Sequence, residues 1–152
     1  MADLGGGARR FSPSDLRFLK LYLHSLDRAG NKKLRVTGTV LALPAWLALK
    51  AEALHLAGRT SEALETLNEG ETLAERFEQR VYFSRLHRFL GVSLATIGAD
   101  EAQIQASFGE AIRIAKEQKA ISLQKRAEET YAEYRRQKAS ASPGCRFRLP
   151  FW

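Results

Sequence analysis

The chain has 152 residues, of which 45% are hydrophobic, 27% charged and 9% aromatic. This balance excludes collagen-like, mucin-like and wholly disordered chains, and it is typical of one soluble domain with a sizeable core. The longest nearly uncharged apolar stretch, residues 40–49, has ten residues, about half of what a membrane-spanning helix needs. The N-terminus lacks the order of a secretory signal, and the single Cys145 cannot form an internal disulfide. We therefore expect no membrane span and a reducing, cytoplasmic location.

Charge is distributed unevenly along the chain, whose net charge is +7. Residues 1–35 carry eight basic and three acidic side chains, residues 36–110 carry six and ten, and residues 111–152 carry ten and four. The two ends are therefore basic and the middle is acidic. A basic surface attracts acidic partners or nucleic acid through long-range fields, but the acidic middle would repel a long phosphate backbone.

The N-terminal third contains one predicted helix. Residues 1–11 are rich in glycine and have no hydrophobic period, which predicts a disordered N-terminus. A Ser-Pro-Ser-Asp start and leucines spaced on one face predict a helix over residues 13–28. Residues 32–43 hold β-branched residues around a glycine, so we interpret them as a linker. Residues 12–43 are thus predicted to be a lone helix and linker.

The clearest pattern begins with a pair of amphipathic helices. The first helix starts at Pro44 and ends at Gly58, and the second is capped by Thr60 or Ser61 and runs to about Phe77. A turn this short forces the two helices to run antiparallel and to pack against each other. The residues predicted to face the core of this pair are Leu43, Leu47, Ala51, Leu54, Leu56, Ala63, Leu64, Leu67, Gly70, Leu73 and Ala74.

Three further helices are predicted after this pair. The third carries Val81 and stops at Gly98, the fourth starts at a capping box of Asp100 and Gln103, and the fifth spans residues 120–137. Their predicted core residues are Leu86, Leu90, Gly91, Leu94, Ile104, Phe108, Ala111, Ile112, Ile114, Ala115, Leu123, Ala127, Tyr131 and Tyr134.

A change of composition separates the helices from the end of the chain. We predict a helical-repeat domain over residues 44–138 and a flexible basic and aromatic tail over residues 139–152. Phe147, Phe151 and Trp152 give this tail an aromatic cluster of the kind that docks into a hydrophobic groove. We expect this tail anchor to bind either its own chain or a partner.

The two helix pairs repeat each other at a nearly constant offset. Gly58 matches Gly98 at an offset of 40 residues, and Leu67 matches Phe108 at an offset of 41 residues. The offset grows by one because the turn of the second pair has one extra residue. Such self-similarity predicts an all-α fold in which antiparallel helical hairpins stack as a short α-solenoid. An unrelated four- or five-helix bundle is the alternative. Small residues are expected where the helices cross closely, namely Ala51, Gly91, Ala63, Gly70 and Ala111.

The order of these residues resembles the tetratricopeptide repeat. The first copy carries the resemblance through Leu47, Ala51, Leu54, Gly58, Ala63, Leu67 and Gly70, and the second through Leu90, Gly91, Leu94, Gly98, Phe108 and Ala111. The second copy departs from the family at Ile104, where the family prefers Ala, and the period is longer than the standard repeat of about 34 residues. The resemblance implies a tetratricopeptide-like variant.

A narrower resemblance covers residues 44–152. The pattern is similar to the C-terminal repeat region of large bacterial class III adenylate/guanylate cyclase-type proteins, in which a cyclase domain and an ATPase module precede the repeats. The resemblance implies a regulatory or scaffold piece. It is carried by Leu90-Gly91, Gly98, Ala106-Ser107-Phe108, Ala111-Ile112, Ile114-Ala115, Gln118, Ser122-Leu123, Arg126-Ala127 and the aromatic ending at residues 144–152.

No motif in the sequence points to catalysis. The glycines at residues 5–7 are followed by Ala-Arg-Arg rather than by the residues of a phosphate-binding loop. His24, His55 and His87 lie far apart in the sequence and have no neighbouring Cys or paired carboxylate at the spacing of metal ligands. The six glutamates between residues 62 and 78 have the spacing of a solvated helix face. We therefore predict no enzymatic activity, no cofactor and no metal site.

If the hairpins stack as a solenoid, the first helix of each hairpin lines a concave groove. Arg85 and Arg88 share one face there and can hold a carboxylate or phosphate of an extended peptide. The alternative is that they pair with Glu75 or Glu78. The candidate groove contacts are Glu52, His55, Arg85, Arg88, Gln124 and Glu128.

These patterns favour a non-catalytic interaction or regulatory module that binds a protein or peptide. A truncated fragment without independent function is one alternative. The other is a basic helical nucleic-acid binder using Arg113, Lys116, Lys119, Lys125, Arg126, Arg135, Arg136 and Lys138.

Overall fold

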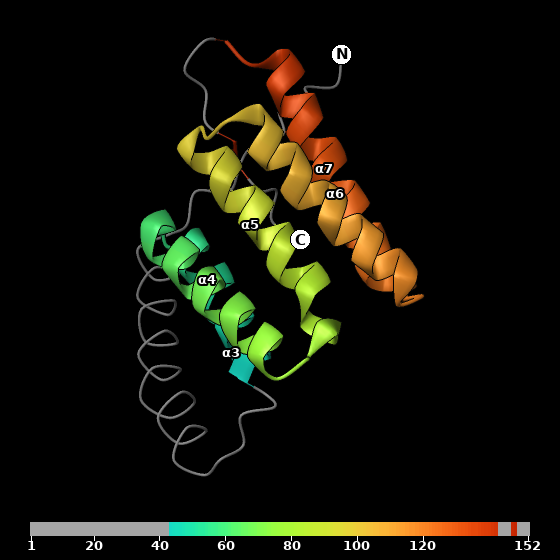
Figure 1. Cartoon of the computed structure of the whole chain (residues 1–152). Helices are drawn as coiled ribbons and strands as arrows, with labels where there is room; N and C mark the ends of the chain where they lie inside the picture. The colour runs from blue at the N-terminus through green and yellow to red at the C-terminus, as the bar shows by residue number, and fades with distance from the viewer. Residues whose placement is uncertain (1–42, 143–146, 149–152) are drawn as a thin grey trace.

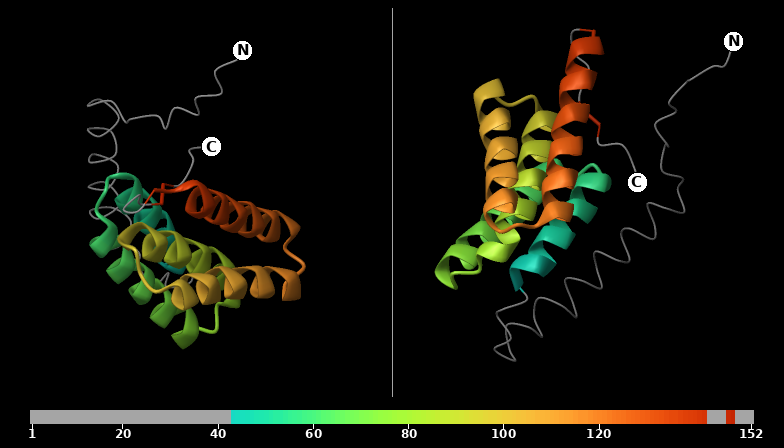
Figure 2. Two further views of the ribbon diagram at one scale, coloured as in Figure 1. Left: turned by 90° about the horizontal axis from the view of Figure 1, so that it is seen from above. Right: turned by 90° about the vertical axis from the view of Figure 1, so that its right-hand side faces the viewer.

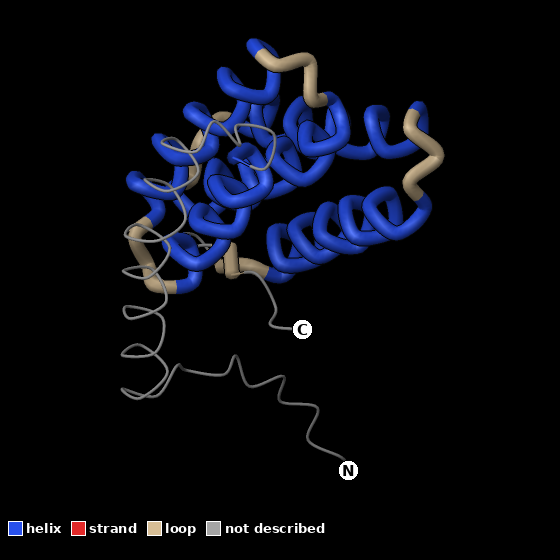
Figure 3. The backbone as a smooth tube through the Cα atoms, turned by 90° about the horizontal axis from the view of Figure 1, so that it is seen from below, coloured by secondary structure: helices blue, strands red, loops and turns tan. Residues whose placement is uncertain are grey.

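The computed structural model describes residues 43–142 and 147–148, and within these ranges every regular element is a helix (Figure 3). The all-α prediction is therefore confirmed for the described residues. The predicted disordered segment of residues 1–11, the predicted helix over residues 13–28 and all of the predicted linker at residues 32–43 except its last residue lie outside them. That last residue, Leu43, belongs to the first described helix rather than to a linker. The elements are α3 (Leu43–Leu56), α4 (Thr60–Arg76), the 3₁₀ turn η3 (Arg80–Tyr82), α5 (Phe83–Ile97), α6 (Glu101–Glu117) and α7 (Ile121–Ser140).

The first helix of each hairpin ends at a glycine, as predicted. Gly58 and Gly98 have φ angles of 76° and 71°, in the left-handed region that a glycine adopts without steric cost. At both ends the residue after the glycine donates its backbone N–H to a carbonyl five residues earlier. Arg59 bonds to the carbonyl of Leu54 at 2.9 Å, and Ala99 bonds to that of Leu94 at 3.0 Å. Both turns therefore have the same hydrogen-bonded cap.

The second helices also end alike, although no glycine is present there. Glu78 and Lys119, at matching positions of the two hairpins, both have a φ angle of 54°. The following N–H again bonds five residues back, from Gln79 to Ala74 at 2.7 Å and from Ala120 to Ala115 at 2.9 Å. A left-handed residue with a side chain costs on the order of 1 kcal/mol. The repeat is thus preserved in backbone geometry where the sequence differs.

The helices pack in a regular order. Helix α4 contacts both α3 and α5, helix α6 contacts both α5 and α7, and the first helices contact each other as α3 with α5 and α5 with α7. Figure 1 shows α3 and α4 on the left, α5 in the middle, and α6 and α7 on the right. Seen from above in Figure 2, α4 and α6 lie along one side and α7 lies on the other. The surface shared by α3, α5 and α7 is called the inner face below.

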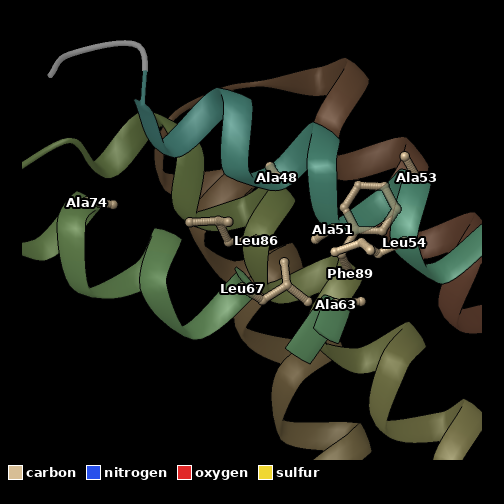
Figure 4. Close-up of a cluster of buried hydrophobic side chains, with 9 residues drawn as sticks. All are labelled: Ala48, Ala51, Ala53, Leu54, Ala63, Leu67, Ala74, Leu86 and Phe89. Carbon is tan, nitrogen blue, oxygen red and sulfur yellow. The ribbon is translucent and has the colours of Figure 1, made fainter. Parts of the chain in front are cut away.

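The core has two parts. The first fills the α3–α4 hairpin and is mostly aliphatic, and in Figure 4 the ring of Phe89 from α5 lies beside Leu54. The second joins α5, α6 and α7 and is rich in aromatic rings. Its central residue, Phe108, is completely buried, and its ring stacks on that of Tyr131 with centroids 5.2 Å apart.

Two glycines allow the close helix contacts that the sequence predicts. A Cβ atom at Gly91 would lie 3.0 Å from the ring of Phe108, and one at Gly70 would lie 3.1 Å from a terminal methyl of Leu86. Both distances are shorter than ordinary van der Waals contact. Small residues at these crossings therefore set how closely α4, α5 and α6 approach.

The predicted caps at the helix starts are wrong. Helix α4 begins at Thr60 with Arg59 as its N-cap, and no side chain bonds to the free amides there, because neither Thr60 nor Ser61 precedes the helix. Asp100 is the N-cap of α6 as predicted, but its side chain makes no capping bond, so the expected capping box with Gln103 does not form. The N–H of Gln103 bonds instead to the backbone carbonyl of Asp100 at 3.1 Å.

The predicted core face of α5 is shifted around the helix. Leu86 and Gly91 are buried as expected, but Leu90 and Leu94 are only half-buried. Phe89 and Val92, which the prediction left out, are fully buried. Val81 lies before the helix in η3 and is 58% exposed. On a helix surface, residues three positions apart and residues four positions apart are both neighbours. In α5 the residues that face the core follow the spacing of three, as Leu86, Phe89 and Val92 do.

Candidate functional site

The inner face carries a group of polar residues from three helices, which we call the inner-face cluster and which consists of Glu52, His55, Arg85, Arg88 and Thr130. Arg85 on α5 donates a hydrogen bond of 3.2 Å to the carboxylate of Glu52 on α3. Both side chains are about one third exposed, at 35% and 33%. The predicted alternative, pairing of Arg85 with Glu75 or Glu78, is wrong because the partner comes from the neighbouring first helix.

Arg88 is buried rather than available for contact, and only 8% of it is exposed. Its guanidinium lies 4.3 Å from the ring centroid of Phe89 and donates a hydrogen bond of 3.2 Å to the hydroxyl of Thr130 on α7. Burial is the main reason that the pKa of Arg88 is lowered to about 10. Repulsion from Arg85 and Arg126 also lowers it, whereas attraction by Glu52 raises it. The prediction that Arg88 is a groove contact is therefore wrong. Arg88 joins α5 to α7 instead.

His55 lies one helical turn after Glu52 on α3 and is half-buried. Burial lowers its pKa, and the nearby carboxylate of Glu52 opposes that shift. Its Nδ1 atom is buried and has no hydrogen-bond partner among the described residues. Burial therefore favours the neutral form of His55 beside the ion pair.

Gln124 and Glu128 do not join the other predicted contacts. Their side chains hydrogen-bond to each other along α7 at 2.9 Å. The carboxylate of Glu128 also lies 4.0 Å from the ammonium of Lys116 on α6. This pair therefore lies on the flank of α7 that faces α6. Of the six predicted groove contacts, the structure brings together only the four on α3 and α5.

A cleft between α4, α5 and α6 contains much of the acidic run. It is lined by Glu71, Glu75 and Glu78 from the first hairpin, by glutamates of α6 and by His87. The Nε2 atom of His87 lies 3.5 Å from the carboxylate of Glu71. Arg113 pairs with both Glu110 and Glu117, and its hydrogen bond lowers the pKa of Glu110. Glutamates that are balanced by neighbouring cations are typical of a solvated helix surface.

A second cleft lies where the α5–α6 turn meets the end of α7, and the tail enters it. Phe147 is only 6% exposed and packs edge-on against the ring of Tyr134, with centroids 5.5 Å apart. Ala95 and Ile104 also line the cleft. In Figure 2 the short red segment that marks residues 147–148 lies beside the C-terminal half of α7. Phe147 therefore docks on its own chain, whereas Phe151 and Trp152 lie outside the described residues.

The backbone of the docked tail is held by one side chain. Gln137 on α7 donates to the carbonyl of Arg148 at 2.7 Å and accepts from the N–H of Arg148 at 3.0 Å. The same amide nitrogen donates to the carboxylate of Glu133 at 2.8 Å, which fixes its orientation. Gln137 thus bonds to the main chain of the tail in the way that one strand bonds to another.

Glu101 fixes the aromatic wall of this cleft. Its carboxylate accepts a hydrogen bond of 2.7 Å from the hydroxyl of Tyr134 and pairs with Lys138. The hydrogen bond from Lys138 has the larger effect and that from Tyr134 the next largest, and they lower the pKa of Glu101 to about 2. Burial, together with this bond, raises the pKa of Tyr134. The ring of Tyr134 is therefore held in position from its hydroxyl end.

Most of the basic residues considered for nucleic-acid binding have acidic neighbours. Lys116, Lys125, Arg136 and Lys138 each lie within 4.0 Å of a glutamate, as Arg113 does twice. Arg135 lies over the ring of Tyr131, 4.7 Å from its centroid. These pairings weaken the positive field that a phosphate backbone would meet.

Two features are absent from the part of the chain that the structure describes. No group of three or more His, Cys, Asp or Glu side chains in residues 43–142 and 147–148 is arranged to hold a metal ion. No helix in the same ranges is long and apolar enough to cross a bilayer. His24 and Cys145 lie outside these ranges.

Comparison with known proteins gives one informative relative. No protein-family model and no solved structure matches the chain. An uncharacterized protein of Rhizobium meliloti (strain 1021) is 31% identical over 110 residues, which is 72% of this chain but 11% of the relative. The chain thus spans about a tenth of that protein's length. The similar region is one segment of a far longer polypeptide.

Sequence reasoning missed the residues that complete each site. Thr130 and Phe89 hold Arg88, and spacing on a single helix cannot reveal a partner that lies 42 residues away. Gln137 was missed because a lone glutamine in a basic helix carries no recognisable signal. The pairing of Arg85 with Glu52 could be predicted from the sequence, since both residues occupy the same face of neighbouring first helices.

Proposed function

We propose that the chain is a non-catalytic, tetratricopeptide-like helical-repeat module that binds a protein or peptide partner on its inner face. The observation that carries the proposal is the repeated geometry of the two hairpins. Left-handed caps recur at Gly58 and Gly98, where the first helices end, and again at Glu78 and Lys119, where the second helices end. Repeats of this kind are interaction scaffolds, because stacking leaves one extended face open.

The packing order supports a solenoid rather than an irregular bundle. Each second helix lies between two first helices, as α4 does between α3 and α5 and α6 between α5 and α7. Helix α7 then occupies the position of the first helix of a third hairpin. A closed bundle would instead bring the first and last helices together around one core.

The role as one piece of a larger regulatory protein rests on two observations. The sequence resembles the C-terminal repeats of bacterial class III cyclase-type proteins, where repeats follow catalytic modules. The relative from Rhizobium meliloti holds its similar segment within a chain about nine times that length. A repeat module in such a chain binds or positions partners while other domains do the chemistry.

The inner-face cluster suggests how a partner is held. Arg85 is partly exposed and makes a single hydrogen bond to Glu52, so a carboxylate from an extended peptide can share or replace that partner. Arg88 is repelled by two nearby cations, Arg85 and Arg126, and attracted by one carboxylate, Glu52. An acidic group on the partner would therefore balance the excess positive charge.

The proposal is tested by recovering partners with the intact chain and with two matched variants. Arg85→Ala removes the exposed inner-face cation, and Arg113→Ala removes an exposed cation on α6 that is also paired with glutamate. Loss of a charged hydrogen bond, worth about 1.5–3 kcal/mol, should reduce recovery of a specific partner at least about tenfold. Arg88→Ala is avoided because that residue is buried.

The expected result is one protein recovered from nuclease-treated cytoplasmic extract by the wild type and by Arg113→Ala, but not by Arg85→Ala. Equal recovery with all three chains would contradict the assignment of the inner face. Recovery of nucleic acid alone from a parallel extract without nuclease, lost between low and physiological salt, would favour the electrostatic binder instead.

A further inference from the structure

The docked tail shows what kind of segment the cleft at the end of α7 can take. One aromatic side chain, Phe147, enters an apolar space walled by Ala95, Ile104 and the ring of Tyr134. The residue that follows, Arg148, is held through its backbone alone, and its side chain is exposed. The cleft thus selects an aromatic anchor and is indifferent to the next side chain.

The receptor side of this contact is held by residues outside the tail. Tyr134 is fixed through its hydroxyl by Glu101, and Gln137 is oriented by Glu133. All of these residues belong to α6 and α7, and none belongs to the tail. A site whose walls and hydrogen-bonding groups are held by their own neighbours loses little freedom on binding.

We propose that this cleft is a peptide-binding site for an extended segment with an aromatic anchor, and that the chain's own tail occupies it as an exchangeable ligand. The partner is a polypeptide with a Phe followed by any residue that has a free backbone N–H, which excludes proline. The proposal uses none of the inner-face residues and so stands independently of the function proposed above.

Exchange is favoured by how little holds the tail. In the described residues the contact consists of one buried ring and two hydrogen bonds to one glutamine. The advantage of the tail is that it belongs to the same chain as the cleft, which gives an effective concentration on the order of millimolar. A partner with the same anchor and additional contacts can overcome that concentration.

The test uses the full chain and a fluorescein-labelled peptide of residues 142–149 in which Cys145 is replaced by serine. This length leaves out Phe151 and Trp152. Fluorescence anisotropy measures binding to the wild type, to Phe147→Ala, which empties the cleft, and to Arg148→Ala, which keeps both the ring and the backbone bonds. If the tail occupies about 90% of the wild-type sites, peptide binding to Phe147→Ala should be about tenfold tighter than to the wild type. Arg148→Ala should behave as the wild type does.

Two altered peptides and one further variant test the chemistry. A peptide with Phe147→Ala lacks the anchor, and a peptide with Arg148→Pro lacks the N–H that bonds to Gln137. The peptide without the anchor should bind the emptied chain at least about tenfold more weakly, because it loses a buried ring. The peptide with proline should bind about two- to tenfold more weakly, the loss expected for one neutral hydrogen bond. Gln137→Ala added to Phe147→Ala should weaken the original peptide similarly, whereas Arg85→Ala added to it should change nothing.

Three results would overturn the proposal. The first is that Phe147→Ala, with unchanged helical content by circular dichroism, binds no peptide at millimolar concentration. The second is that it binds the anchored and anchorless peptides equally. The third is a wild-type dimer that becomes monomeric in Phe147→Ala, which would reassign the cleft to exchange of tails between two copies. If Phe147→Ala loses helical content, Phe147→Leu keeps the apolar side chain, and the same comparison of peptides applies to it.

Discussion

The two hairpins have the same backbone caps but different interiors. The first hairpin is filled by alanines and leucines around one buried ring, Phe89. The second is filled by Phe108, Tyr134 and the docked Phe147, with Tyr131 packed against them. The difference is compensated at matched positions. Ala51 and Leu67 in the first hairpin correspond to Gly91 and Phe108 in the second, so a larger side chain in one helix accompanies a smaller one in the other.

This exchange shows that the repeat conserves volume and turn geometry rather than residue identity. Cores tolerate substitution when the total volume is kept. A ring brings directional contacts that an alkyl chain does not, because its edges and faces must meet complementary surfaces. The second hairpin therefore gains a rigid aromatic wall, and this wall is the surface against which the tail docks.

The largest expected effect comes from removing the central ring. Phe108→Ala should lower the free energy of unfolding by about 3–5 kcal/mol, since the side chain is fully buried and stacked on Tyr131. Leu67→Ala, at the matched position, removes a smaller side chain and should lower it by less, within the range of about 2–5 kcal/mol for such changes. Urea denaturation followed by circular dichroism measures both. Ile121→Ala is the control, because that side chain is 78% exposed and should change stability by less than about 0.5 kcal/mol. A smaller loss in Phe108→Ala than in Leu67→Ala would show that the aromatic packing is not the stronger of the two.

A second prediction tests the volume exchange directly. Gly91→Ala places a Cβ atom 3.0 Å from the rigid ring of Phe108 and should cost about 1–3 kcal/mol. Gly70→Ala places a Cβ atom 3.1 Å from a terminal methyl of Leu86, which can rotate away, and 3.4 Å from the Cβ atom of Leu47, at the edge of ordinary van der Waals contact. Its cost should be offset by the better helix propensity of alanine, worth about 1 kcal/mol.

The sharper form of this test is a double-mutant cycle in urea. Gly91→Ala combined with Phe108→Leu reproduces the residue pair of the first hairpin. The cost of Gly91→Ala should then be at least about 0.5 kcal/mol smaller than in the wild-type background. Strict additivity would mean that the two positions are not compensating for each other.

A third prediction concerns Arg88, which covers the one ring that the first core buries. Arg88→Ala should cost about 2 kcal/mol through loss of the contact with Phe89 and of the packing of its long stem. Arg88→Met keeps the apolar stem and removes the charge, whose burial is unfavourable, and should cost less. Arg85→Ala breaks a partly exposed pair and should cost less than about 1 kcal/mol. Equal losses in Arg88→Ala and Arg88→Met would show that the charge, and not the stem, is what stabilises the fold.

The sequence predicts the elements well because the signals for them are local. The glycine stops at Gly58 and Gly98 follow from conformational freedom alone, and the structure has them at a positive φ. The helix ends at Glu78 and Lys119 have the same geometry without a glycine, so residue preferences do not predict them. Leucine spacing predicts the wrong core face for α5, because the buried row there includes Phe89 and Val92.

The site residues were harder to predict because their partners come from other helices. Arg88 has the composition of a surface residue, and its burial depends on Thr130 of α7 and on the ring of Phe89. The docking of Phe147 was expected as one of two outcomes, but its receptor was not, since Gln137 and Glu101 act through geometry that only the packed helices create. The solenoid and its partner stay proposals.

The smallest expected effect is a pH dependence that belongs to the second hairpin alone. The folded-state pKa of Glu101 is lowered from 4.5 to about 2, chiefly by its bonds to Lys138 and Tyr134. A carboxylate with a lowered pKa contributes stability that is present above its unfolded pKa and is lost as the pH falls through 4.5 toward 2. The matching position of the first hairpin is Thr60, the first residue of α4 as Glu101 is the first of α6, and its side chain cannot titrate in this range.

Glu101→Gln should therefore reduce the fall in the thermal midpoint between pH 6 and pH 3. The control is Glu65→Gln, which removes a charge from the exposed face of α4 and should leave the fall close to that of the wild type. Hydrogen exchange at low pH should show α6 and α7 losing protection before α3 and α4 in the wild type, and this order should fade in Glu101→Gln. An identical acid response in the wild type and Glu101→Gln would show that the carboxylate does not hold the aromatic wall, and the docking of Phe147 against Tyr134 would then depend on ring packing alone.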